Sequence, residues 1–184
     1  MDGGKTWKSL ENLPESEDGE AAFAASASSM IGIKKGLIFG TGGSVSNLHY
    51  YRFSDERWTK VISPILQGEA SQGIFAIAWI RDGLIGIGGD YTQLEKREKN
   101  AFIYKDGIFE FPEVSPLGYR SGVAYLKKGD LLVAVGPSGS DYSQDGGMIW
   151  ENFSATGYHA VKVSEDQKSI WSSGSTGRVG VLIQ

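Results

Sequence analysis

Four polar residues have the types and positions that could support chemistry in this 184-residue chain: Glu20, Asp90, Arg120 and His159. Two carboxyl groups on either side of a glycosidic bond can hydrolyse it, one as acid and one as base or nucleophile. An arginine beside them could orient an anionic group. Polar residues of this kind also pair with one another without doing chemistry, so a catalytic and a structural role both stay open.

The same stretches of sequence contain candidate binding residues. We interpret as ligand contacts the residues Gln72, Tyr91, Tyr119, Arg120 and His159. The two tyrosines could stack on a sugar or a peptide, although tyrosines in such positions also pack against the walls of a channel.

Composition excludes several classes of site. The chain has no cysteine and two histidines, His49 and His159, which argues against a metal site. No glycine-rich turn opens a helix, so no dinucleotide or other cofactor is expected. A net charge of −4 argues against nucleic acid as a partner. No apolar run approaches the ~20 residues of a membrane span, and residues 1–15 do not resemble a signal segment.

One short pattern recurs four times at intervals of about 40–50 residues, which indicates repeated supersecondary units. Each copy has an acidic residue in a turn, followed at short distance by an aromatic ring. The pairs are Asp2 with Trp7, Asp55 with Trp58, Asp106 with Phe109, and Asp145 with Trp150. An Asp followed by glycines favours a tight hairpin whose N–H groups the carboxylate caps, and the indole packs over it. We therefore interpret these eight residues as structural.

The segments between these copies are short, rich in Val, Ile and aromatic residues, and bounded by turn residues, which predicts strands. Residues 19–29 contain several alanines, but we expect loop and strand there as well. Four strands per unit of this length are typical of a β-propeller blade. The sequence therefore predicts one all-β domain, 1–184, a propeller of four-stranded antiparallel blades. The expected blades are about 26–64, 71–114, 119–154, and 157–184 completed by residues 5–10.

Two consequences follow from that expectation. The N- and C-terminal strands should pair with each other, share the last blade and leave no exposed edge. The loops that enter successive blades should converge on one face, placing Glu20, Gln72, Arg120 and His159 around a common mouth. Asp90 and Tyr91 would join them there.

The pattern resembles the Asp-box, or BNR, repeat of sialidase-like proteins. The resemblance extends to a bacterial branch related to photosystem II stability and assembly factors, through phrases spread over nearly the whole chain. They are residues 19–26, 41–43, 73–75, 88–91, 118–125 and 174–178. Members of that branch are usually about twice as long. The resemblance therefore implies that this chain corresponds to the C-terminal half of such a protein, that a homodimer could complete a larger ring, and that the protein is exported or periplasmic.

Sialidase chemistry needs an arginine cluster, and only Arg120 is suitably placed for one. We therefore expect a non-catalytic scaffold that binds a protein, peptide or glycan. The alternative is a carbohydrate-active hydrolase that uses Glu20 and Asp90, with Arg120 orienting an anionic group. Two carboxylates in an open cleft would favour hydrolysis, whereas a mouth closed by tyrosines would favour binding or a purely structural role.

Overall fold

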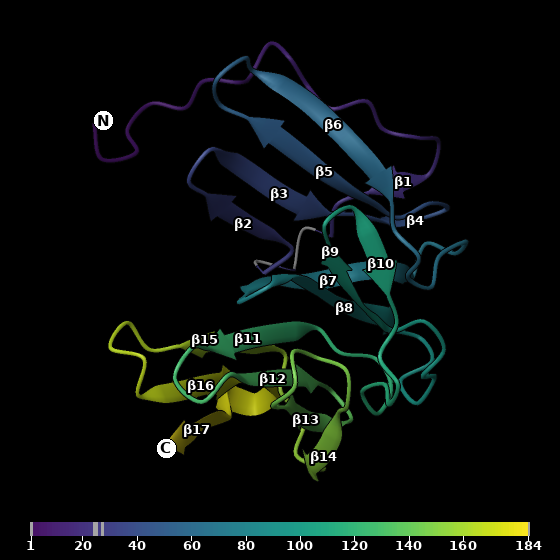
Figure 1. Cartoon of the computed structure of the whole chain (residues 1–184), viewed down its shortest axis with the longest axis vertical. Helices are drawn as coiled ribbons and strands as arrows, with labels where there is room; N and C mark the ends of the chain where they lie inside the picture. The colour runs from purple at the N-terminus through teal and green to yellow at the C-terminus, as the bar shows by residue number, and fades with distance from the viewer. Residues whose placement is uncertain (1, 24–25, 27, 184) are drawn as a thin grey trace.

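The computed structural model describes residues 2–23, 26 and 28–183 and is built from strands, with one short 3₁₀ turn (Figure 1). The strands form four antiparallel sheets that follow one another along the chain. The first sheet has the order β2-β3-β5-β6 and comprises β2 (Met30–Ile33), β3 (Gly36–Gly40), β5 (Asn47–Arg52) and β6 (Arg57–Ile62).

The second sheet is the largest and has the order β1-β4-β7-β8-β9-β10. Its strands are β1 (Glu20–Ala21), β4 (Gly42–Gly43), β7 (Gln72–Ile80), β8 (Gly83–Asp90), β9 (Ala101–Lys105) and β10 (Ile108–Glu110). Two of these strands lie apart from the rest in the chain: β1 precedes the first sheet, and β4 lies between its strands β3 and β5. Gly42 of β4 pairs with Gly73 of β7. Glycine is required on both sides, because a Cβ on either residue would overlap the backbone of the other strand.

The third and fourth sheets complete the described part of the chain. The third has the order β11-β12-β13-β14, with β11 (Gly122–Leu126), β12 (Leu131–Gly136), β13 (Gly139–Ser143) and β14 (Glu151–Ser154). The fourth has three strands in sequence order, β15 (Ala160–Val163), β16 (Ser169–Ser173) and β17 (Val179–Ile183), with the 3₁₀ turn Ser175–Gly177 between the last two.

Three apolar clusters hold consecutive sheets together, one at each junction. Leu48 packs with Phe102 between the first and second sheets. Ile85 packs with Leu132 between the second and third. Val133 packs with Ile170 between the third and fourth. Neighbouring residues of β12 thus enter different clusters, because successive side chains of a strand point to opposite faces.

The same junctions carry a repeated backbone hydrogen bond. In each case an amide near the start of the next sheet donates to a carbonyl that lies near the end of β3, β8 or β12 or just beyond it. The bonds run from Ile74 to Thr41, from Arg120 to Gly88 and from Tyr158 to Gly136, each 3.0 Å long. These bonds place the starts of successive sheets along one side of the molecule.

The prediction of all-β structure is confirmed, and so is the loop and strand expected over residues 19–29, of which 24, 25 and 27 lie outside the described residues. The prediction of a propeller made of four-stranded blades is wrong. The structure has four separate antiparallel sheets of four, six, four and three strands, and none of them is closed or curled. The strand counts depart from four because β1 and β4 extend the second sheet, while the fourth sheet gains no strand from the N-terminal segment.

The predicted pairing of the terminal strands is also wrong. Residues 5–10 form no strand, and the N-terminal segment lies beside the first sheet, while β17 lies at the opposite end of the molecule (Figure 1). Asn12 holds the segment there: its backbone carbonyl accepts a hydrogen bond from Trp58 Nε1 (2.9 Å), and its side-chain Nδ2 donates to the Glu56 carbonyl (2.5 Å). Side-chain contacts near β6 thus hold the segment away from the fourth sheet.

Candidate functional site

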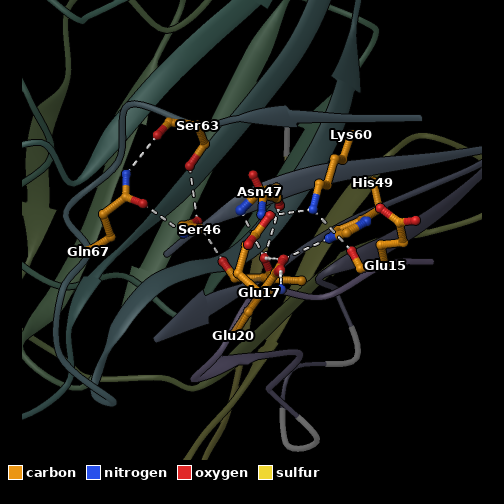
Figure 2. A network of polar contacts seen from close by, with 10 residues as sticks. Glu15, Glu17, Glu20, Ser46, Asn47, His49, Lys60, Ser63 and Gln67 are labelled. Atoms are coloured by element: carbon orange, nitrogen blue, oxygen red, sulfur yellow. Dashed lines mark hydrogen bonds and ion pairs between the residues drawn. The ribbon is translucent and has the colours of Figure 1, made fainter. Parts of the chain in front are cut away.

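Glu20 is the centre of a buried polar network between β1 and the first sheet (Figure 2). Its Oε1 lies 2.7 Å from His49 Nε2 and accepts a hydrogen bond from Thr41 Oγ1 (2.6 Å). The Glu17 amide donates to Oε2 (2.8 Å). The side chains of His49 and Glu20 are only 2% and 1% exposed, so this pair is inside the protein rather than in an open cleft.

The network continues into the loops on either side of Glu20. Thr41 Oγ1 accepts from the Asn47 amide (2.8 Å), and Ser46 Oγ donates to the Thr41 carbonyl (2.6 Å). On the outer side, Lys60 Nζ bonds Glu17 Oε1 at 2.5 Å. Figure 2 shows His49 and Lys60 both directed toward the N-terminal segment. The network therefore fastens residues 12–21 to the first sheet.

The electrostatics of Glu20 do not suit a general acid. Burial by itself raises the pKa of this carboxyl, but the hydrogen bonds from His49, Thr41 and the backbone outweigh it and lower the pKa to about 2. A proton donor at neutral pH needs a raised pKa. Glu20 is therefore ionised at neutral pH and already has partners.

Asp90, like Glu20, is a buried carboxylate whose hydrogen bonds keep it ionised. Its carboxylate accepts from Gln72 Nε2 (3.1 Å), Thr92 Oγ1 (2.6 Å) and Gln93 Nε2 (3.2 Å), and it is buried. Burial raises its pKa, but these hydrogen bonds hold the pKa far below the usual range of an aspartate. With both carboxyls held ionised, the geometry gives the hydrolase alternative no support.

An aromatic cluster fills the space beside Asp90. Phe23 stacks on Phe75 with ring centroids 3.9 Å apart. Tyr119 and Tyr91 meet Phe75 edge to face at 4.9 and 6.0 Å. Burial raises the pKa of Tyr119, which keeps its hydroxyl neutral. Two of the predicted binding residues thus pack against an interior ring, and only Tyr91 is exposed.

Arg120 is fully buried in an ion pair. Its Nε donates to Asp141 Oδ2 (2.5 Å), and its Nη1 donates to the Tyr119 carbonyl and to Ser138 Oγ. Because this guanidinium is already paired inside the protein, it does not present a free clamp for an anionic substrate.

His159 is exposed, and its Nε2 lies 2.8 Å from Ser175 Oγ in the 3₁₀ turn. The structure thus brings Gln72, Asp90, Tyr91 and Tyr119 together. Among the described residues, no hydrogen bond or ion pair joins Glu20 or His159 to them. Within the described residues, direct hydrogen bonds therefore connect only some of the residues expected around a common mouth.

The clearest acid–glycine–indole turn is the one at Asp145. Its Oδ1 accepts from the amides of Met148 and Ile149 (both 3.0 Å) and from Ser143 Oγ (2.7 Å). Trp150 Nε1 donates to the Gly147 carbonyl (2.9 Å), and the indole is 3% exposed. This turn closes the β13–β14 connection and matches the structural role expected from the sequence.

The other three copies vary in form. Asp2 Oδ1 accepts from the Gly4 and Lys5 amides (both 3.1 Å), while Asp55 Oδ1 pairs with Arg52 Nε (2.9 Å). Trp58 packs against Tyr51 with centroids 4.7 Å apart. In the remaining copy, Phe109 packs on Phe102 and Tyr104 after a turn in which Asp106 has a positive φ.

A groove between the first and second sheets is a large concave site formed by the described residues, and sequence reasoning missed it. Its volume is about 660 Å³, within the range typical of ligand sites. Its lining has an apolar floor, aromatic walls and a charged rim, made by Ile33, Ile38, Leu48, Tyr50, Thr59, Lys60, Val61, Trp79, Arg81, Asp82, Gly83, Leu84, Tyr104, Lys105 and Asp106.

Trp79 is the residue that could have signalled this groove. It lies near the end of β7, where most side chains are buried, yet its indole is about half exposed. In the sequence Phe75-Ala-Ile-Ala-Trp79, however, it is indistinguishable from a core residue. Its exposure depends on how far the first sheet stands from the β7–β8 turn, which is a tertiary property.

Over residues 2–23, 26 and 28–183, no group of three or more His, Cys, Asp and Glu side chains is placed to hold a metal ion. Over the same residues, no helix has the length and apolarity that a membrane crossing requires.

No protein-family model matches this sequence, and a comparison with curated proteins found no match. Solved structures of similar fold include a designed protein and a nutrient binding protein. A computationally designed protein, Ika4, has a TM-score of 0.56 and 9% identity over 88% of this chain and 93% of its own. An auxiliary nutrient binding protein from Bacteroides thetaiotaomicron VPI-5482 has a TM-score of 0.55 and 12% identity over 82% of this chain and 39% of its own. At these identities the similarity concerns the fold alone.

Proposed function

We propose that this chain is a non-catalytic binding scaffold whose groove between the first and second sheets receives a polypeptide segment with a large apolar side chain. The groove itself carries the proposal. Leu48 and Leu84 form a buried floor, and the indole of Trp79 stands half exposed beside it. A partly exposed tryptophan in a concave apolar site is the kind of residue that dominates binding energy.

The lining favours a peptide over a glycan. Sugar hydroxyls need hydrogen-bonding partners, and a desolvated hydroxyl without one is costly. The floor is aliphatic, and the uncharged hydroxyl groups of the lining are those of Tyr50, Thr59 and Tyr104. The charged groups, among them Lys60, Arg81 and Asp82, can pair with a peptide backbone or with its charged side chains.

A peptide library displayed on phage tests this proposal, with selection on the wild-type protein. Peptides that bind wild type should bind Trp79→Ala at least about tenfold more weakly, a loss of about 1.4 kcal/mol. The matched control is Trp171→Ala, since Trp171 is a similarly exposed tryptophan on the fourth sheet outside the groove. Failure to select any peptide, or equal binding to Trp79→Ala and wild type, would refute the proposal. Trp79-dependent binding on a glycan array, without peptide binding, would replace peptide by glycan.

We further propose that the acid–glycine–indole turns are Asp-box repeats of the type found in photosystem II stability and assembly factors. The turn around Asp145 supports the assignment, because its carboxylate caps two amides while Trp150 covers the turn. Homologous sequences in which Asp145 and Trp150 are replaced by many other residue types would argue against the Asp-box assignment.

A homodimer is the remaining part of the proposal. It is supported by the apolar outward face of the fourth sheet, which nothing covers within the described residues. Sedimentation across a range of protein concentrations tests it, and a monomer throughout the soluble range would refute it.

A further inference from the structure

The fourth sheet has an apolar face that the rest of the chain leaves exposed. Trp171, Val179, Val181 and Ile183 share this outward face and are between 47% and 73% exposed. In the third sheet, the position corresponding to Trp171 is Val133, which is 2% exposed because the fourth sheet covers it. The outward face of the fourth sheet is therefore like a sheet interface without its partner.

The edge of the same sheet is also unpaired among the described residues. β17 pairs with β16 only, whereas the corresponding strand of the third sheet, β13, pairs with both β12 and β14. A free apolar edge strand is a template for pairing with another chain.

Residues 6–10 of the N-terminal segment pair with no strand among the described residues. Its turn is formed as at Asp145, with the Asp2 carboxylate accepting two amides and Trp7 Nε1 donating to the Gly4 carbonyl (3.1 Å). Trp7 is nevertheless 92% exposed, whereas Trp150 is 3% exposed. The turn is present, but the strand that should follow it has no sheet to join.

The segment cannot reach β17 of its own chain. Asn12 and Glu17 hold it to the first sheet through Trp58 and Lys60, and β17 lies at the other end of the molecule (Figure 1). If residues 6–10 pair with β17, the two segments must therefore belong to different copies of the chain.

We propose that residues 6–10 of one copy add to β17 of a second copy as an antiparallel strand, with Lys8 opposite Val181. The register follows from the third sheet, where Glu151, the residue after Trp150, lies opposite Tyr142. Two reciprocal additions close a dimer. This interface rests on the homodimer proposed above and is independent of the groove.

Cysteine cross-linking tests the register cleanly, because the chain has no cysteine of its own. Oxidation of the variant with Lys8→Cys and Val181→Cys should give a covalent dimer joined through these two positions, as identified by mass spectrometry. The control pairs Lys8→Cys with Ile108→Cys on β10, which is also an exposed edge strand. It should give no mixed disulfide.

Val181→Lys is the second test, made on the otherwise unchanged chain. A lysine on this apolar edge should raise the dissociation constant of the dimer at least about tenfold. A monomeric wild type would refute the homodimer and this interface together. A dimer that resists Val181→Lys and gives no disulfide between positions 8 and 181 would refute this interface alone.

Discussion

Replacing Glu20 by glutamine should loosen the N-terminal segment at neutral pH but not in acid. The pKa of Glu20 is lowered from 4.5 to about 2, and at about 1.4 kcal/mol per unit this amounts to about 3 kcal/mol of stability. A lowered carboxyl pKa stabilises the folded state fully above the unfolded value of 4.5. That contribution is lost as the pH falls from about 4.5 to about 2.

The structure also shows which contact a glutamine cannot replace. An amide oxygen in the place of Oε1 can still accept from His49 and Thr41, but an NH₂ group in the place of Oε2 faces the Glu17 amide, which is also a donor. One hydrogen bond is lost and two donors face each other. We therefore expect Glu20→Gln to cost about 2–3 kcal/mol at pH 7.

Thermal unfolding at several pH values between 7 and 2.5 measures this cost. For a chain of this size about 1 kcal/mol changes Tm by roughly 2–4 °C, so Tm should fall by roughly 5–10 °C at pH 7. Hydrogen exchange over residues 11–21 gives a local readout and should increase if the segment detaches first. The difference from wild type should shrink as the pH falls below 4.

Glu98→Gln is the matched control, because Glu98 is exposed and its carboxylate makes no hydrogen bond within the described residues. It should leave Tm and its pH profile as in wild type. A Glu20→Gln protein whose Tm differs from wild type by the same amount at pH 7 and pH 2.5 would refute the reasoning, because the cost would then not come from the ionised carboxylate. No difference at any pH would refute it too.

Three further changes test the structural roles assigned above. Asp141→Ala leaves the Arg120 guanidinium buried without its partner and should cost about 3–5 kcal/mol in urea unfolding; recovery in a double variant that also carries Arg120→Met would identify the stranded charge as the cause. Trp150→Ala should cost about 3–5 kcal/mol, and Trp79→Ala less than about 1 kcal/mol, because only the first indole is buried; equal costs would contradict the assigned burial. Gly88→Ala should prevent folding to a soluble product, since a Cβ there would overlap a backbone oxygen of β7; normal expression and Tm would show that the two strands are not so closely packed.

Most of the polar residues that the sequence suggested as catalytic form buried hydrogen bonds with other side chains of the protein. Glu20 meets His49, Asp90 meets Gln72, and Arg120 meets Asp141. Each of these contacts satisfies a buried polar group at a sheet end. The exposed concave surface lies elsewhere and is largely apolar.

Local features of this protein could be predicted from sequence. Short segments rich in Val, Ile and aromatic residues predicted strands, and the Asp145-Gly-Gly turn with Trp150 predicted a hairpin covered by an indole. These features depend on residues within a few positions of one another. A carboxylate beside its own turn, and β-branched and aromatic residues between turn residues, are both properties of the local chain.

The assembly of strands into sheets could not be predicted in this way. The contact between Glu20 and His49 spans 29 residues, and β4 joins the second sheet although it lies between two strands of the first. Residues 6–10 read as a strand, yet contacts of Asn12 and Glu17 draw the segment to the first sheet. Any strand edge offers the same N–H and C=O groups, so its partner is chosen by side-chain contacts distant in sequence. The sequence by itself therefore determined the strands and turns, while the tertiary structure alone decided which edges meet and where the groove opens.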